Sequence, residues 1–226
     1  MKKLLKFLFW TAPKWFVILS VTMVLALKCV PVTKTVMMLK RTMEYRDDSS
    51  FRVNQQWLPL EGNSTTVAKI TIAAEDPCFF RHHGFGDEDQ TRLLSRAKCG
   101  GPDVRGAITL SQKTAQAVFM TGCSTLLDEG VRDWFTFLIE HLWGKKRIAE
   151  VYMNVAEYAP GLYGAEAASR HYYRRSAKEI GIDRMAALSL CPGNPAVLTP
   201  GIVNSRFQGE RYAVVCQEKL MAFPAW

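Results

Sequence analysis

Residues 73–85 read AAEDPCFFRHHGF and hold the densest concentration of chemically able side chains in the sequence. Glu75 and Asp76 stand beside two alanines, and three phenylalanines, an arginine and two histidines come after them. A carboxylate with apolar neighbours is a candidate general base, because desolvation raises its pKa toward the working pH and nearby cations set how far it rises. An acid-rich helical turn followed by a polar loop is the plain structural interpretation, since structural ion pairs are common. Residue types alone leave both interpretations open.

Length and charge restrict what the chain can be. Its 226 residues fit one domain of ordinary size plus an appendage. The formal net charge of +8 indicates an anionic partner, which leaves nucleic acid, a phospholipid surface and a phosphorylated substrate open. The six cysteines form no CxxC pair and no zinc-ligand cluster. Free thiols are therefore expected, and no metal site is predicted.

The segment 1–32 is interpreted as a cytoplasmic tail and a transmembrane anchor. Lysines crowd the first six residues, and an uninterrupted apolar run of about 13 residues extends from Trp15 to Leu27. That run is shorter than the roughly 20 residues that cross a bilayer, but counting from Phe7 to Val32 gives enough length. A cleavable signal peptide and a buried core helix are the alternatives. The lysine bias places the N-terminus in the cytoplasm and residues 33–226 beyond the membrane.

The rest of the chain is expected to be mainly α-helical, with a juxtamembrane stalk at 33–56 and a catalytic domain at 57–226. Apolar periodicity and capping residues place the helices, and no strand alternation is visible. The expected helices cover Thr33–Asp48, Val67–Ala74, Arg105–Met120, Val131–Leu142, Lys145–Val155, Gly164–Tyr173, Ile182–Leu190 and Arg206–Met221. An anchored basic domain beyond the membrane disfavours nucleic acid and fits an anionic, lipid-linked substrate.

Four ordered motifs resemble those of the peptidoglycan glycosyltransferases, the lysozyme-like helical domains of penicillin-binding proteins. The order of elements is similar to that of the monofunctional biosynthetic transglycosylases, which carry one N-terminal membrane helix. The similarity spans roughly Trp57 to Leu220 as well as the anchor. The motifs are Glu75-Asp76-x-x-Phe79-x-x-His82-x-Gly84 for the first signature, Gly106-Ala107-x-Thr109-x-Ser111-Gln112 for the second, Lys145-x-x-Ile148-x-x-x-Tyr152-x-Asn154 for the fourth, and Gly161-x-Tyr163-Gly164-x-Glu166-Ala167-Ala168 for the segment C-terminal to the fourth.

The resemblance implies a lysozyme-like domain at the bacterial inner membrane that polymerises lipid II into linear glycan strands. It implies inversion at the anomeric carbon, release of undecaprenyl pyrophosphate, and Glu75 as the general base. The expected partners are lipid II, the growing glycan strand, membrane lipids, and cell-wall synthesis or division proteins. No cofactor is certain, and a divalent cation such as Mg²⁺ stays open as a bridge to the pyrophosphate. The substrate-binding residues that the resemblance implies are Asp76, Phe79, His82, Gly84, Thr109, Gln112, Lys113, Arg132, Lys145 and Asn154.

The third signature, Arg-Lys-x-x-Glu, is inverted in this chain. It falls on Asp128-Glu129-Gly130-Val131-Arg132, so that Arg132 stands where the second acid belongs. In the second signature, Lys113 replaces the last glutamine and Gln116 the usual downstream lysine. Asp128 and Arg132 also have the i, i+4 spacing of a plain surface ion pair.

Several interpretations of this inversion stay open. Lys113 and Arg132 can hold the pyrophosphate while Glu75 acts alone, or the chain is a weakened homologue that binds lipid II as a cell-wall scaffold. An alignment shifted by one helical turn puts Thr136 at the acid position and restores no carboxylate. A lytic glycosidase is the third functional hypothesis, because a lysozyme-like fold with one glutamate can also serve hydrolysis. His82 is interpreted as an orienting residue, and Asn154 as a buried hydrogen-bonding one.

Overall fold

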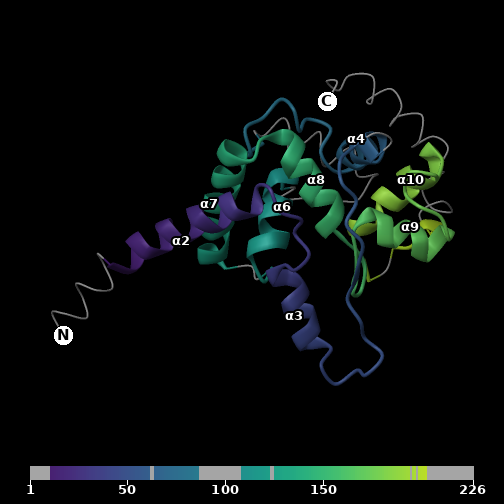
Figure 1. The fold of residues 1–226 in the computed structure, drawn as a ribbon, viewed down its shortest axis with the longest axis horizontal. Helices are drawn as coiled ribbons and strands as arrows, with labels where there is room; N and C mark the ends of the chain where they lie inside the picture. Colours follow the sequence, from purple (N-terminus) through teal and green to yellow (C-terminus); the bar gives the residue numbers. More distant parts are fainter. Residues whose placement is uncertain are drawn as a thin grey trace.

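The computed structural model describes residues 11–61, 64–86, 108–122, 125–193, 195–196 and 198–202. These residues are mainly helical, as predicted (Figure 1). The predicted helix at Arg206–Met221 lies outside them. The helices are α2 (Ala12–Leu27), α3 (Val36–Glu44), α4 (Ser64–Glu75), α6 (Leu110–Phe119), α7 (Leu126–Leu142), α8 (Lys145–Val155), α9 (Ala165–Tyr173) and α10 (Ile182–Ser189), with a short 3-10 turn, η2, at Cys191–Gly193.

A small sheet joins the stalk to the domain, and the expectation of a chain without strands was wrong. Its strands are β1 (Asn54–Gln55), β2 (Glu157–Ala159) and β3 (Leu162–Tyr163), in the order β1-β3-β2. β1 runs parallel to β3, and β2 runs antiparallel to it. Strands of two or three residues are too short to show the alternation by which a sequence reveals a strand.

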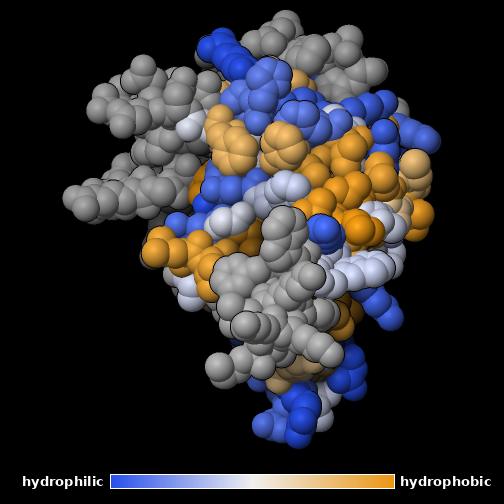
Figure 2. Space-filling view, turned by 90° about the vertical axis from the view of Figure 1, so that its left-hand side faces the viewer, coloured by the Kyte–Doolittle hydropathy of each residue, from blue (hydrophilic) through white to orange (hydrophobic). Residues whose placement is uncertain are grey.

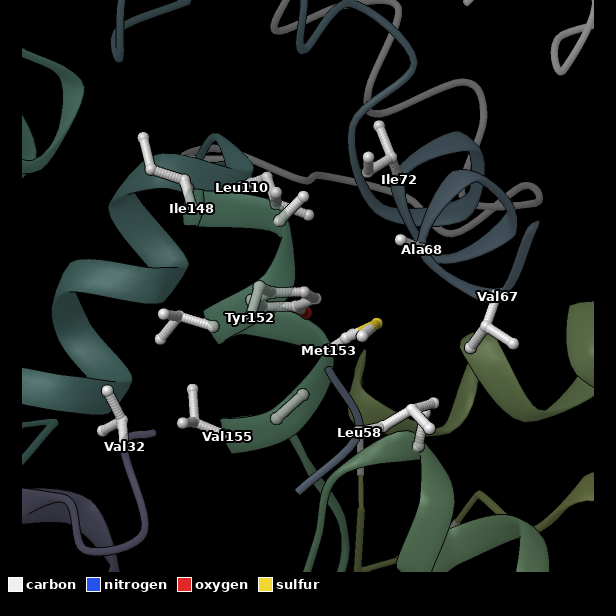
Figure 3. Close-up of a cluster of buried hydrophobic side chains, with 14 of the residues drawn as sticks. Val32, Leu58, Val67, Ala68, Ile72, Leu110, Ile148, Tyr152, Met153 and Val155 are labelled. Atoms are coloured by element: carbon white, nitrogen blue, oxygen red, sulfur yellow. The ribbon is translucent and has the colours of Figure 1, made fainter. Parts of the chain in front are cut away.

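Helix α8 forms the centre of the core. The apolar spacing of this segment predicts one face made of Ile148, Val151, Tyr152 and Val155. All four residues are buried, and so are Ala149 and Met153 on other faces. A helix that is apolar on several sides is expected to be enclosed by others, and α8 contacts α6, α4, α7 and α9. Figure 3 shows Met153 of α8 extending toward the side on which Val67 and Ala68 of α4 lie.

Helix α7 begins five residues before its apolar stripe, because Thr125 and Asp128 form a capping box. The Asp128 carboxylate accepts hydrogen bonds from the Thr125 hydroxyl (2.6 Å) and backbone N–H (3.0 Å). These bonds lower the pKa of Asp128. The Arg132 Nε instead donates to Asp133 Oδ1 at 3.2 Å. The interpretation of Asp128 and Arg132 as an ion pair was therefore wrong, because each side chain has a nearer partner.

Helix α2 packs on the domain with one side only. Indole N–H groups from α7 and its C-cap, Trp134 and Trp143, donate to Ser20 Oγ (3.0 Å) and the Val24 carbonyl oxygen (2.7 Å). The other side of α2 exposes apolar side chains, among them Trp15 (56%) and Leu19 (62%). Figure 2 views the end of the molecule at which α2 projects, where apolar surface gathers.

Across the described ranges, no helix is both long and apolar enough to cross a bilayer. Helix α2 has 16 residues, and residues 1–10 of the predicted anchor are outside the description. The transmembrane anchor, which was counted from Phe7 to Val32, therefore stays a prediction.

Helix α3 occupies the middle of the predicted stalk helix. The Thr35 side chain caps it by accepting from the Met38 N–H. Met38 is buried, whereas Leu39 and Met43 are exposed. Arg41 turns inward, and its Nε donates to the Glu157 carboxylate at 3.2 Å. This contact ties α3 to β2.

The buried thiol of Cys191 makes the stability of the fold sensitive to alkaline pH. Burial raises its pKa from the ordinary 9.0 to about 12. The unfolded chain releases this proton first, so stability that is complete below pH 9.0 is lost as the pH rises toward about 12. We compare the unfolding free energy at pH 9.0, the ordinary pKa of a cysteine thiol, with that at pH 10.0, the ordinary pKa of tyrosine. Over this rise in pH, we expect the unfolding free energy of Cys191→Ala to fall by about 1 kcal/mol less than that of wild type.

Urea denaturation at the two pH values measures this difference. Cys29→Ala is the matched control because Cys29 is exposed, and it should show the wild-type pH dependence. An equal loss in Cys191→Ala and wild type would contradict the assignment to the buried thiol.

Candidate active site

A cavity of about 370 Å³ opens where α3, α4, α6, α8, the sheet and η2 meet. This volume is within the range of small-molecule sites in proteins. Glu75 and Lys113, two of the predicted site residues, line it, and no residue of α7 does so among those described. The lining residues are Met37, Glu75, Ile108, Lys113, Gln116, Ala117, Tyr152, Val155, Ala156, Glu157, Tyr163, Pro192 and Pro195.

Glu75 is the last residue of α4 and is only 3% exposed. It was predicted to lie at or just past the end of this helix. Its Oε2 contacts the Lys113 Nζ of α6. Burial raises the pKa of Tyr152 and Tyr158, and the negative charge of Glu75 raises both further. Glu75 is thus a buried acid in the cavity wall, and among the described residues the Lys113 cation contacts it.

The turn after Glu75 is fixed by Asp76. Asp76 is fully buried, and its Oδ2 accepts from His82 Nε2 (2.8 Å) and from the Leu110 N–H (2.9 Å). The other ring nitrogen, His82 Nδ1, accepts the Gly84 N–H at 3.1 Å, so the shared proton belongs on Nε2. His82 orients the turn in this arrangement, which is the role that the sequence indicated for it.

The first turn of α6 carries the second signature. Thr109 and Gln112 form a capping box, and the Thr109 hydroxyl also donates to the Gly84 carbonyl oxygen. The Gln112 Nε2 donates to Asp133 Oδ1 at 3.1 Å, the same oxygen that Arg132 contacts. Asp133 therefore places Arg132 beside Gln112 of α6. The residue after Gln112 is Lys113, which contacts Glu75.

Another acid, Glu140 of α7, was missed by the sequence analysis, and its side chain is only 5% exposed. Its Oε1 contacts the Ser111 hydroxyl and accepts from Lys145 Nζ at 2.7 Å. A Cβ atom at Gly84, whose φ is +97°, would lie 2.9 Å from the Glu140 Cγ. Glu140 therefore lies next to one residue from each of three signatures, namely Gly84, Ser111 and Lys145. One signal in the sequence could have pointed to Glu140. It follows Asp133 by seven residues, which is two helical turns, so both acids lie on the same side of α7.

Lys145 and Phe79 lie within this second cluster. The Lys145 ammonium is 4.4 Å from the centre of the Phe79 ring, a cation–π distance. Burial lowers the pKa of Lys145, although the hydrogen bond and charge of Glu140 oppose this. Phe79 is completely buried. Neither residue is part of the cavity lining.

Asn154 is completely buried and holds the backbone of Leu58 against α8. Its Oδ1 accepts from the Leu58 N–H (2.7 Å), and its Nδ2 donates to the carbonyl oxygens of Leu58 and Glu150 (2.8 Å each). These contacts fit the buried hydrogen-bonding role indicated by the sequence. Its substrate-binding role remains a prediction, as do those of Asp76, Phe79, His82, Gly84, Thr109, Gln112, Arg132 and Lys145. Among the described residues, no group of three or more histidines, cysteines or acids is placed to hold a metal ion.

Glu75 is thus a buried glutamate at a helix end, facing a cavity in a mainly helical domain. The model of the family described as Transglycosylase matches residues 42–219, which is most of the chain, and the chain therefore belongs to the transglycosylase family. This confirms the resemblance inferred from the sequence.

Within this family the chain is similar to proteins named biosynthetic peptidoglycan transglycosylase. One from Chromohalobacter salexigens is 39% identical over 181 residues, which cover 80% of this chain and 77% of the relative. One from Pseudomonas aeruginosa is 36% identical over 182 residues, with 80% and 78% covered. One from Shewanella oneidensis is 42% identical over 143 residues, with 63% and 61% covered.

Proposed function

We propose that this chain polymerises lipid II into linear glycan strands, by an inverting glycosyl transfer that releases undecaprenyl pyrophosphate. The observation that carries the proposal is Glu75, a buried carboxylate at the wall of a cavity with Lys113 against it. Family membership and the names of the relatives support the same reaction. The inverted third signature does not remove Glu75 or Lys113 from the cavity.

In the proposed reaction, the Glu75 carboxylate accepts the proton of the attacking sugar hydroxyl. The hydroxyl oxygen of the acceptor sugar forms a bond to the donor's anomeric carbon as the bond from that carbon to the pyrophosphate breaks. Before the transfer, Lys113 neutralises the charge of Glu75. Glu75 becomes neutral when it takes the proton, so the charge of Lys113 is then left to stabilise the pyrophosphate. Lys113 therefore first neutralises the base and then stabilises the leaving group. Arg132 adds a further positive charge beside α6.

We also propose a single-pass location in the bacterial inner membrane, with the N-terminus in the cytoplasm and the domain on the far side. The exposed apolar side of α2 and the lysines before it support this location. Exposed Leu39 and Met43 on α3 would face the lipid surface. Because Met37 of α3 lines the cavity, this helix would bring the site close to a lipid-linked substrate.

Incubation of the full-length protein in detergent with labelled lipid II tests the proposed function. We expect glycan chains longer than the starting disaccharide, together with released undecaprenyl pyrophosphate. Lipid II that binds but stays unpolymerised in several detergents would identify a scaffold and overturn the proposal. Soluble muropeptides released from purified sacculi would instead identify a lytic glycosidase.

A further inference from the structure

A basic patch covers the end of α9, the turn after it and the start of α10. Five cations of the segment 170–184 are exposed there, together with two acids, Glu179 and Asp183. With histidine neutral, the segment has a formal charge of +3. The five cations that make up the basic patch are Arg170, Arg174, Arg175, Lys178 and Arg184.

Most of these cations are not used by the fold. Arg174, Arg175 and Lys178 form no ion pair with any residue that the structure describes. The Nε atom of Arg170 donates to Glu166 Oε1 at 2.7 Å, but the Arg170 side chain is still 54% exposed. The patch therefore presents positive charge that a partner can bind.

The turn that carries the patch is held in place by hydrogen bonds. The Ser169 hydroxyl donates to the Arg175 carbonyl oxygen at 2.8 Å. The Oε2 atom of Glu166 accepts from the Ser176 hydroxyl and the Ala177 N–H, both at 2.9 Å. Because the backbone is already ordered, a partner that binds here loses less conformational entropy in the complex.

Arg174 ends α9 in the left-handed conformation, with a φ of 57°. It is the one non-glycine residue with a positive φ in the ranges that the structure describes. A Cβ atom is crowded in this conformation, and glycine is the usual residue where a helix ends in this way. An arginine in a strained backbone position indicates a role for its side chain.

The composition of the patch suits a protein partner. Four of its five cations are arginines, and Tyr172 and Tyr173 are half-buried in the same segment. The Arg184 guanidinium lies 5.6 Å from the centre of the Tyr173 ring. Arginine and tyrosine are enriched in protein interfaces, whereas lysine is depleted there. Because a guanidinium can bind a carboxylate through two hydrogen bonds, an acidic protein segment fits both features.

The position of the patch disfavours two other partners. Figure 1 shows α9 and α10 at the opposite end of the molecule from α2, whose exposed apolar side suits lipid. A domain held at a membrane through α2 would direct the patch away from the lipid surface. A second copy of this chain is also disfavoured, because two chains of net charge +8 repel each other.

We propose that the basic patch is a docking surface for an acidic segment of another protein, with Arg174 and Arg175 paired with its carboxylates. These two arginines are adjacent, exposed and without an acid of their own. The inference goes beyond the proposed function, because no residue of the patch is part of the described cavity lining. A partner docked here is held at the end of the domain opposite α2.

Fluorescence anisotropy with the full-length protein in a neutral detergent tests the proposal. The probe is a labelled synthetic peptide in which glutamate and tyrosine alternate. We expect the peptide to bind, and Arg174→Gln/Arg175→Gln to weaken its binding about tenfold because two exposed ion pairs are lost. A peptide in which lysine replaces glutamate should not bind. Failure of the acidic peptide to bind, or equal binding of both peptides, would overturn the proposal.

A second double variant separates the patch from the overall charge of the chain. Arg46→Gln/Arg52→Gln removes the same charge from two exposed arginines between α3 and β1. In about 0.1 M salt, where charges more than about 10 Å apart are screened, it should bind the acidic peptide within about twofold of wild type. Equal losses in the two double variants would show attraction to net charge alone, and the docking surface would be wrong.

Arg174→Gly separates recognition from folding. Glycine adopts a positive φ without strain, so the thermal midpoint of this variant should be at or above that of wild type. Its affinity for the acidic peptide should nevertheless fall about threefold, since one ion pair is lost. Wild-type affinity in Arg174→Gly would contradict the proposed pairing of Arg174.

Two further measurements decide between the classes of partner. If the full-length protein in neutral nanodiscs binds phosphatidylglycerol vesicles, and Arg174→Gln/Arg175→Gln abolishes this binding, the patch is a lipid site and the proposal fails. The same double variant should polymerise lipid II at the wild-type rate, and slower polymerisation would assign the patch to the glycan strand instead. Peptide binding by a protein that never polymerises lipid II would overturn the proposed function alone.

Discussion

Glu75→Gln is expected to lower the rate of glycan formation from lipid II by about 10²- to 10⁴-fold, the usual contribution of a general base. The amide has the size of the carboxylate but cannot accept the proton of the attacking hydroxyl. It also no longer neutralises Lys113, with which Glu75 pairs in the free protein. The chain should still fold, because the contact between residues 75 and 113 can persist as an amide–ammonium hydrogen bond.

The measurement is the initial rate with labelled lipid II, together with the thermal midpoint of each variant. Glu150→Gln serves as the control, because it removes a glutamate that is paired with Arg147 outside the cavity lining. We expect it to polymerise at the wild-type rate. A Glu75→Gln protein that is folded and as fast as wild type would show that another group is the base.

Asp76→Ala is expected to destabilise the protein by about 2–6 kcal/mol, because it strands two buried donors that each cost about 1–3 kcal/mol when unsatisfied. These donors are His82 Nε2–H and the Leu110 N–H, and both point at Asp76 Oδ2. Asp76→Asn should cost less, because one amide oxygen can replace Oδ2 as the acceptor for both. The other carboxylate oxygen, Oδ1, has no hydrogen-bond partner among the described residues, so the amide nitrogen that replaces it would be left without an acceptor there.

Chemical denaturation of the three proteins gives the order of stability, with Asp76→Ala lowest, Asp76→Asn between, and wild type highest. The same loss in both variants would contradict the prediction that an acceptor oxygen at this position restores part of the stability. Stability in Asp76→Ala equal to that of wild type would contradict the buried hydrogen-bond network altogether.

Local sequence patterns were sufficient for most of the described helices and for the position of Glu75. The apolar spacing in α8 predicted a buried face that the structure confirms for Ile148, Val151, Tyr152 and Val155. The cap residues and apolar run before Glu75 placed it at a helix end, where α4 does end. Such features depend on residues within one or two turns of each other, which a sequence displays directly.

Pairwise contacts of side chains were predicted poorly. Asp128 and Arg132 have the right spacing for an ion pair, yet Asp128 caps its helix and Arg132 turns to Asp133. Spacing along a helix permits a contact but does not choose among competing partners. A hydroxyl or backbone N–H at a helix start is a nearer partner for an acid than a cation one turn away.

The sequence by itself determined a mainly helical domain of this family and the one acid at the end of α4. Only the tertiary structure decided which groups share the space around that acid. It brought Lys113 against Glu75 and Glu157 into the same cavity wall, and it left Arg132 outside the lining. The physical reason is that these residues come from elements far apart in the chain, and their distances depend on how α4, α6, α8 and the small sheet pack around one core. No local pattern records that packing.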